Sequence, residues 1–125
     1  MAAGRYSFVI EQGATLNFQI NWTDVSGSAI DLSGYGGKMQ IRQNYEATPL
    51  ITLSSSLQPD GTGINMSGSN GTTPLASGSI GIYISAYSSS LLDFNEGIYD
   101  LELMKSNEVI RLLEGKVKLS KNVTR

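Results

Sequence analysis

The chain has 125 residues, of which 40% are hydrophobic and 16% are charged, and its formal net charge is −2. This size and apolar content fit a single domain with its own core over residues 1–125. Cysteine and histidine are both absent, which excludes disulfides, thiolate or imidazole metal sites and histidine-dependent catalytic triads.

The same composition limits the classes of partner. No basic run occurs, and free nucleic acid is not expected as a partner, because phosphate binding needs clustered lysine and arginine. No stretch approaches the roughly 20 apolar residues of a membrane-spanning helix. The first residues lack the apolar segment of a secretory signal, which favours synthesis in the cytoplasm. Without a visible carboxylate cluster, we expect no metal ion, no cofactor and no enzymatic activity.

The clearest pattern in the first half of the chain is the alternation of apolar and neutral polar residues at 14–23. This period of two predicts a strand with one buried face. A shorter strand is expected before it at residues 6–10. After two turns, further strands are expected around residues 38–42 and at residues 50–53.

The second half continues with short strands and frequent turns. A turn around Asp60 leads to a brief strand at residues 64–66, and a Gly-, Ser-, Asn- and Thr-rich loop follows at residues 67–79. The next strand is expected at residues 79–85. Residues 86–94 are the one helical candidate.

The last two strands form a predicted hairpin. A strand with Tyr99 on its inner face leads through a turn at residues 106–107 into a strand at residues 109–119, in which Gly115 suggests a bulge. Tyr99 is either a tyrosine corner, whose hydroxyl bonds upstream backbone, or an ordinary half-buried tyrosine.

Together these elements predict an all-β fold. Seven to nine short strands and one helical turn indicate an immunoglobulin-like antiparallel β-sandwich. We expect residues 6–10 and 117–119 to lie at sheet edges, open to pairing. The side chains expected to be mostly buried are Leu16, Phe18, Ile20, Trp22, Met39, Ile41, Ile82, Tyr99, Leu101 and Leu103.

Several segments, in the same order along nearly the whole chain, resemble a family of short phage virion proteins. They are Glu11-Gln12-Gly13-Ala14-Thr15, Ile30-Asp31-Leu32-Ser33-Gly34-Tyr35 with Met39-Gln40-Ile41-Arg42, Gly97-Ile98-Tyr99-Asp100-Leu101-Glu102-Leu103, Arg111-Leu112-Leu113-Glu114-Gly115, and the ending Asn122-Val123-Thr124-Arg125. A more distant similarity is to the N-terminal domain of phage baseplate upper proteins.

The resemblance implies an immunoglobulin-like structural part of a phage particle, near the tail or baseplate, and no catalytic residue. Its partners would be other phage structural proteins, with many copies in a symmetric assembly, and its location would be the virion. The chain lacks the long C-terminal extension of the baseplate protein, which favours a connector, adaptor or decoration role over host recognition. The alternatives are a capsid decoration or cement protein and, in another class, a carbohydrate-binding module.

Candidate contact residues are tyrosines and arginines, because both are enriched where protein surfaces meet. An ordinary half-exposed position on a strand remains the alternative for each of them. The candidates are Tyr35, Arg42, Tyr45, Tyr83, Tyr87 and Arg111. The string Asp60-Gly61-Thr62-Gly63 occurs in aspartic proteases, but such enzymes need two carboxylates in one site, so a turn is the favoured interpretation.

Overall fold

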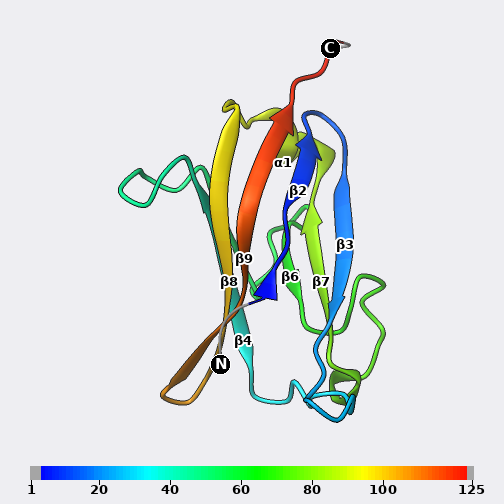
Figure 1. Cartoon of the computed structure of the whole chain (residues 1–125). Helices are drawn as coiled ribbons and strands as arrows, with labels where there is room; N and C mark the ends of the chain where they lie inside the picture. Colours follow the sequence, from blue (N-terminus) through cyan, green and yellow to red (C-terminus); the bar gives the residue numbers. More distant parts are fainter. Residues whose placement is uncertain (1–3, 124–125) are drawn as a thin grey trace.

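Two facing β-sheets make up the protein in the computed structural model, which describes residues 4–123 (Figure 1). Residues 1–3 and 124–125, the latter the end of the last quoted motif, lie outside the described residues. The elements are β1 (Gly4–Arg5), β2 (Phe8–Glu11), β3 (Leu16–Asn21), β4 (Gly36–Arg42), β5 (Ile51–Ser54), β6 (Gly63–Asn65), β7 (Ser79–Ile84), α1 (Ala86–Ser90), β8 (Glu96–Lys105) and β9 (Glu108–Ser120).

The strand order is that of an immunoglobulin-like sandwich. One sheet has the order β3-β7-β6, and the other has the order β1-β9-β8-β4-β5, with β2 also paired to β9. These correspond to the B-E-D strands and to the G-F-C-C′ strands of that fold, and the short helix α1 stands between the strands E and F. The predicted fold class is therefore confirmed.

Several details of the prediction are wrong. The strands β1 and β2 pair with β9 in parallel, so the sandwich is not wholly antiparallel. Residues 117–119 lie between β2 and β8, so of the two segments expected at sheet edges only the N-terminal one is at an edge. The helix ends at Ser90, earlier than expected, and a 3₁₀ turn at Leu75–Ser77 interrupts the predicted loop.

The core between the sheets confirms most of the predicted inner faces. Met39, Ile41, Ile82, Tyr99, Leu101 and Leu103 are all buried. Leu16, Phe18, Ile20 and Trp22 point inward on and just after β3 but are only partly buried. The reason is that β3 is the outermost strand of its sheet, so one side of each of these side chains has no neighbouring strand to cover it.

Gly115 permits a close approach and not the predicted bulge. The ladder of β8 and β9 shifts register between Leu101 and Glu102, which leaves Leu112 as the extra residue. A Cβ atom at Gly115 would lie 2.1 Å from the carbonyl oxygen of Tyr6. The glycine thus lets the N-terminal segment approach β9 closely where the two run side by side.

Tyr99 fastens the same segment from the other strand. Its hydroxyl donates a hydrogen bond of 2.6 Å to the carbonyl oxygen of Tyr6, and its ring meets Phe8 edge to face at 5.0 Å between centroids. Burial, and to a smaller extent Tyr6, raises the pKa of Tyr99 to about 12. The hydroxyl does bond upstream backbone, as in a tyrosine corner, but the acceptor is on the first strands and not a few residues away.

Candidate functional site

Charge is divided unequally between the two sheets. The three strands β3, β6 and β7 contain no charged residue, and none occurs anywhere between Asp60 and Asp93. In contrast, a shallow depression of about 510 Å³ on the outer face of the six-stranded sheet has eight charged side chains among its lining residues. They are Arg5, Lys38, Arg42, Arg111, Lys116, Asp100, Glu102 and Glu114.

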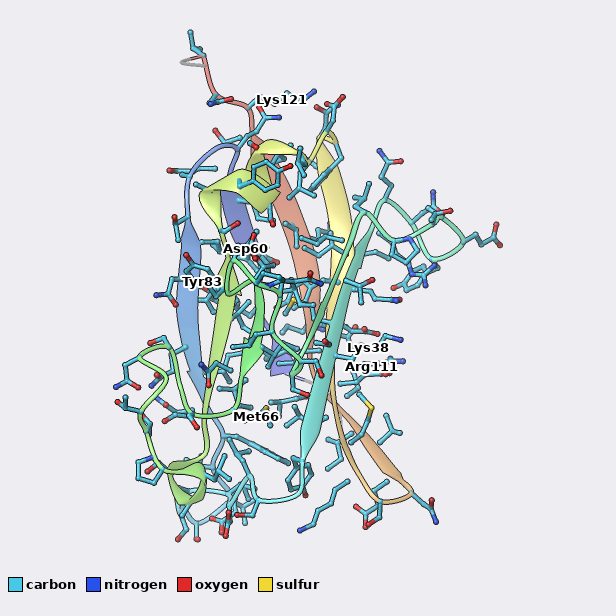
Figure 2. The ribbon with its side chains drawn as sticks, turned by 180° about the vertical axis from the view of Figure 1, so that it is seen from behind. Lys38, Asp60, Met66, Tyr83, Arg111 and Lys121 are labelled. Carbon is cyan, nitrogen blue, oxygen red and sulfur yellow. The ribbon has the colours of Figure 1, made fainter. Side chains whose placement is uncertain are left out.

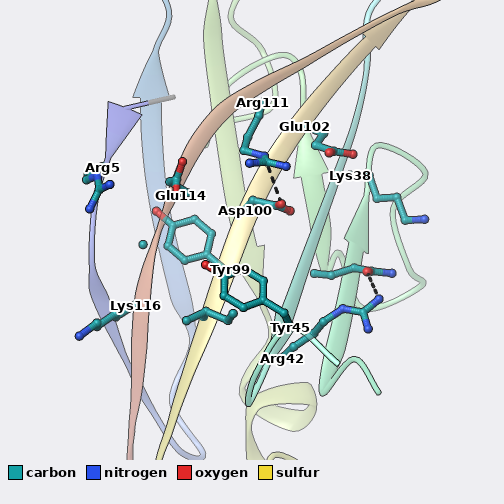
Figure 3. A pocket seen from close by; sticks show the side chains of 13 residues that line it. Arg5, Lys38, Arg42, Tyr45, Tyr99, Asp100, Glu102, Arg111, Glu114 and Lys116 are labelled. Atoms are coloured by element: carbon teal, nitrogen blue, oxygen red, sulfur yellow. Dashed lines mark hydrogen bonds and ion pairs between the residues drawn. The ribbon is translucent and has the colours of Figure 1, made fainter. Parts of the chain in front are cut away.

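The strand register explains how these charges meet. On the outer face, Asp100 of β8 stands directly opposite Glu114 of β9, an unfavourable pairing of like charges. Arg111 lies 3.5 Å from Asp100, and Arg5 is the partner of Glu114 on the other side (Figure 3). The cations thus offset the repulsion of the two carboxylates, but as exposed pairs they contribute little stability.

Arg42 has a local structural role in this depression. Its guanidinium donates to the carbonyl oxygen of Ala47 at 2.5 Å and to Oε1 of Gln40 at 2.8 Å. These bonds fix the loop between β4 and β5. Tyr45 of this loop is 85% exposed and lies at the rim of the depression (Figure 3). Arg42, Tyr45 and Arg111 are therefore brought together, as members of one surface.

The other three candidate contact residues lie elsewhere. Tyr83 is on the outer face of β7, across the sandwich from Lys38 and Arg111 (Figure 2). Tyr87 is 70% exposed on α1. Tyr35 packs edge to face on Trp22 at 5.5 Å, and the ammonium of Lys105 lies 5.2 Å from its ring centre, so its contacts are internal.

The uncharged sheet presents a different kind of surface. Asn17, Gln19 and Asn21 line the outer side of β3, and Tyr83 stands opposite Asn17 on β7. The backbone N–H and the side chain of Ser69, in the loop after β6, donate to Oε1 of Gln19. Because neutral polar groups are cheaper to desolvate than charges, this face can be covered by another protein at lower cost than the charged one. Among the candidate contact residues chosen from the sequence, only Tyr83 lies on this face.

Asp60 is part of a hydrogen-bonded structural network. Its Oδ2 accepts from the hydroxyls of Ser85 at 2.5 Å and Ser88 at 2.8 Å, and its Oδ1 accepts from the N–H of Thr62 at 3.0 Å. These bonds, led by that of Ser85, hold the pKa of Asp60 well below its usual range. The carboxylate thereby joins the turn before β6 to the start of α1, which the Ser85 side chain also caps. These contacts fit the turn interpretation of this string.

The motifs that suggested phage virion proteins also have structural roles. Gln12 donates to the carbonyl oxygen of Leu92, and its Oε1 accepts from the N–H of Asn122. Gly13 has a φ of 82°, a conformation that this turn requires and that glycine adopts without strain. Its N–H donates a hydrogen bond to the hydroxyl of Ser89. The motif at residues 11–15 therefore fastens the β2–β3 turn to α1 and to the C-terminal segment.

Neither a metal centre nor a transmembrane helix is found within residues 4–123. No group of three or more Asp, Glu, His or Cys side chains in that range lies close enough together to hold a metal ion. Likewise, no helix in that range is both long and apolar enough to cross a membrane.

Comparison with known proteins identifies no family for this chain. No family model matches the chain, and no curated protein is similar enough to count as a match. A similar solved structure comes from a photo-crosslinking study of multimeric cell-adhesive interactions of VGSC beta subunits. It has 13% identity and a TM-score of 0.47, over 98% of this chain and 96% of that chain. A likeness of this size says nothing about function.

Proposed function

We propose that this protein is a non-catalytic structural component of a phage virion, a connector or adaptor at the tail or baseplate. It would dock on neighbouring virion proteins through its uncharged sheet. The ordered sequence motifs support the assignment to a virion. The absence of charge from β3, β6 and β7 is the observation that supports docking through this sheet. An uncharged face loses less hydration on contact, which favours permanent burial in an assembly.

A capsid decoration protein would have the same fold and the same kind of surface, and its position in the particle distinguishes it. A carbohydrate-binding module has less support, because its sugar platform would need aligned exposed aromatic side chains. The tyrosines with the largest exposed fractions, Tyr45 and Tyr87, come from separate elements, the β4–β5 loop and α1.

The experiment compares one lysine placed on each sheet. Tyr83→Lys puts a charge on the uncharged face and keeps an apolar stem for packing, whereas Thr52→Lys puts the same charge on the exposed side of β5. Burying an unpaired charge costs several kcal/mol, so we expect Tyr83→Lys to lower the protein's content in purified particles at least about tenfold. Thr52→Lys is expected to assemble like the wild type.

Quantitative mass spectrometry of purified particles gives the readout, with thermal unfolding as the check that both variants fold. If the Thr52→Lys protein were lost from particles and a folded Tyr83→Lys protein were retained, docking would involve the charged sheet and the proposal would be wrong. Absence of the wild-type protein from particles would reject the virion role itself.

A further inference from the structure

The strand β3 has an open edge without the usual protections. Its one partner among the described strands is β7, in an uninterrupted register from Leu16–Ile84 to Asn21–Ser79. Natural sheets protect such edges with charged residues, proline, bulges or very short strands. The sequence Leu-Asn-Phe-Gln-Ile-Asn has six residues and contains no charge and no proline. In Figure 1, β3 is the outermost strand on its side of the molecule.

The backbone groups that are free at this edge can be assigned from the ladder. Trp22 donates its N–H to the carbonyl oxygen of Gly78, on the side of β7, at 2.8 Å. Hydrogen-bonded and non-hydrogen-bonded pairs alternate along an antiparallel ladder. The even-numbered residues of β3 therefore bond to β7, whereas Asn17, Gln19 and Asn21 direct their N–H and C=O groups away from it.

These free groups are arranged so that β3 complements a second copy of itself. When two antiparallel copies are centred on Gln19, residue 17 stands opposite residue 21 of the other copy and Gln19 stands opposite Gln19. All of these are hydrogen-bonded pairs in that register. A shift of one residue would place groups already used by β7 at the new contact.

The side chains match in the same register. On the inner face Phe18 stands opposite Ile20 of the second copy, and on the outer face amide side chains stand opposite amide side chains. Apolar and aromatic cross-strand pairs are favourable, and no like charges oppose each other. The inner side chains of β3 are only partly buried in one copy, so apolar surface remains to be covered.

We propose that two copies of this chain pair through β3, antiparallel and centred on Gln19, to join their uncharged sheets into one six-stranded sheet. The pairing is isologous, with the two-fold axis at Gln19. This deepens the docking function proposed above by naming a partner for the edge of that sheet, and it does not depend on a location in the virion. A single six-residue strand gives a contact at the small end of protein interfaces, so we expect a dissociation constant on the order of 10–100 µM.

The test uses cysteine cross-linking. Because the chain contains no cysteine, only the introduced residues can form a disulfide. Paired Cα atoms in a hydrogen-bonded antiparallel pair lie about 5.5 Å apart, within the range of a disulfide. Gln19→Cys alone is expected to form a disulfide-linked dimer under mild oxidation. Asn17→Cys alone is not, because the two copies of residue 17 would be about 14 Å apart along the strands.

A mixture of the Asn17→Cys and Asn21→Cys proteins provides the decisive arm. It keeps Gln19 and its bonds to Ser69 intact, and it is expected to give a mixed disulfide that neither protein gives by itself. Thr52→Cys on β5 is the matched control, an exposed cysteine on a different edge strand. We expect cross-linking of the mixture at least about tenfold faster than that of the control, and sedimentation of the wild type should show a concentration-dependent dimer.

Cross-linking no faster than in Thr52→Cys, together with a monomer at about 1 mM, would overturn the proposal. A disulfide between two Asn17→Cys chains would overturn the register. A protein that is present in particles but monomeric, with β3 covered by a strand of another virion protein, would refute the dimer and leave the virion role standing. A dimer in solution from a protein absent from particles would do the reverse.

Discussion

Tyr99→Phe removes one hydroxyl and leaves the ring that packs on Phe8. The lost bond to the carbonyl oxygen of Tyr6 is short, 2.6 Å, and holds the first strands onto β9. An intramolecular hydrogen bond of this kind contributes about 0.5–1.5 kcal/mol net. We therefore expect Tyr99→Phe to lower the free energy of unfolding by about 1 kcal/mol at pH 8.

The same hydroxyl makes the free energy of unfolding depend on pH in the alkaline range. An unfolded tyrosine ionises near pH 10, whereas Tyr99 in the folded protein stays neutral up to a pKa of about 12. A raised pKa stabilises the fold fully below pH 10, and this contribution is lost as the pH rises from 10 to 12. The full shift corresponds to about 2.7 kcal/mol, but Tyr99 also lines the outer depression, where water partly screens its hydroxyl, so we expect a loss of about 1–2 kcal/mol.

Urea unfolding, followed by Trp22 fluorescence between pH 8 and pH 11.5, measures both effects. The wild type and Tyr99→Phe should differ at pH 8 and converge as the pH rises, because only the wild type loses the contribution of Tyr99. The other tyrosines are present in both proteins, so their effects cancel in the difference. Equal stability at pH 8, or a difference that stays constant up to pH 11.5, would refute the role given to this hydroxyl.

Four further variants test the packing and the polar network. Phe18→Ala should cost about 2 kcal/mol, because the ring is only partly buried, whereas Ile82→Ala in the fully buried core should cost about 3–5 kcal/mol; urea midpoints in the reverse order would contradict the assigned burial. Gly115→Ala should displace the N-terminal segment and expose the amides of β2 to hydrogen exchange, and unchanged protection there would be inconsistent with the close approach to Tyr6. Asp60→Asn should make stability less dependent on pH in the acid range, because a carboxyl with a lowered pKa stabilises the fold above about pH 4 and loses that effect as the pH falls. Identical acid profiles of the two proteins would argue against the network. A hydrolytic activity that this variant loses would argue against a non-catalytic protein.

The strands and the class of fold followed from local patterns, whereas depth of burial did not. A period of two tells which side chains share a face, and this was correct for Ile82 and Leu101 as well as for Phe18. It does not tell whether a strand is central or at an edge. Phe18 is on the inner face but is partly exposed because its strand is outermost, a consequence of pairings between distant segments.

Long-range pairings also explain the other differences. Parallel pairing of β2 with β9 joins residues more than 100 positions apart, and no local pattern indicates it. It placed residues 117–119 inside the sheet and gave Gly115 its role beneath Tyr6. Because this pairing is long-range, the glycine on its own resembles a bulge, whereas its role is to permit a close approach.

The candidate contact residues show the same limit. Residue type alone singled out Arg42, Tyr45 and Arg111, which the strands and the β4–β5 loop bring to one surface, but it also singled out Tyr35, whose contacts are internal. The uncharged sheet was detectable in the sequence as the long interval without charge between Asp60 and Asp93. Only the strand order shows that this interval and β3 form one surface.

The central claim is that the protein functions by docking in a virion through its uncharged sheet. The most direct test is a cryo-EM map of purified particles that contain the encoded chain, at a resolution that shows side chains. The account predicts this chain at a fixed copy number in the tail or baseplate, with the outer face of β3 and β7 covered by protein and the charged depression less so. Particles that lack the protein, or that hold it by the charged face with β3 and β7 open to solvent, would contradict it.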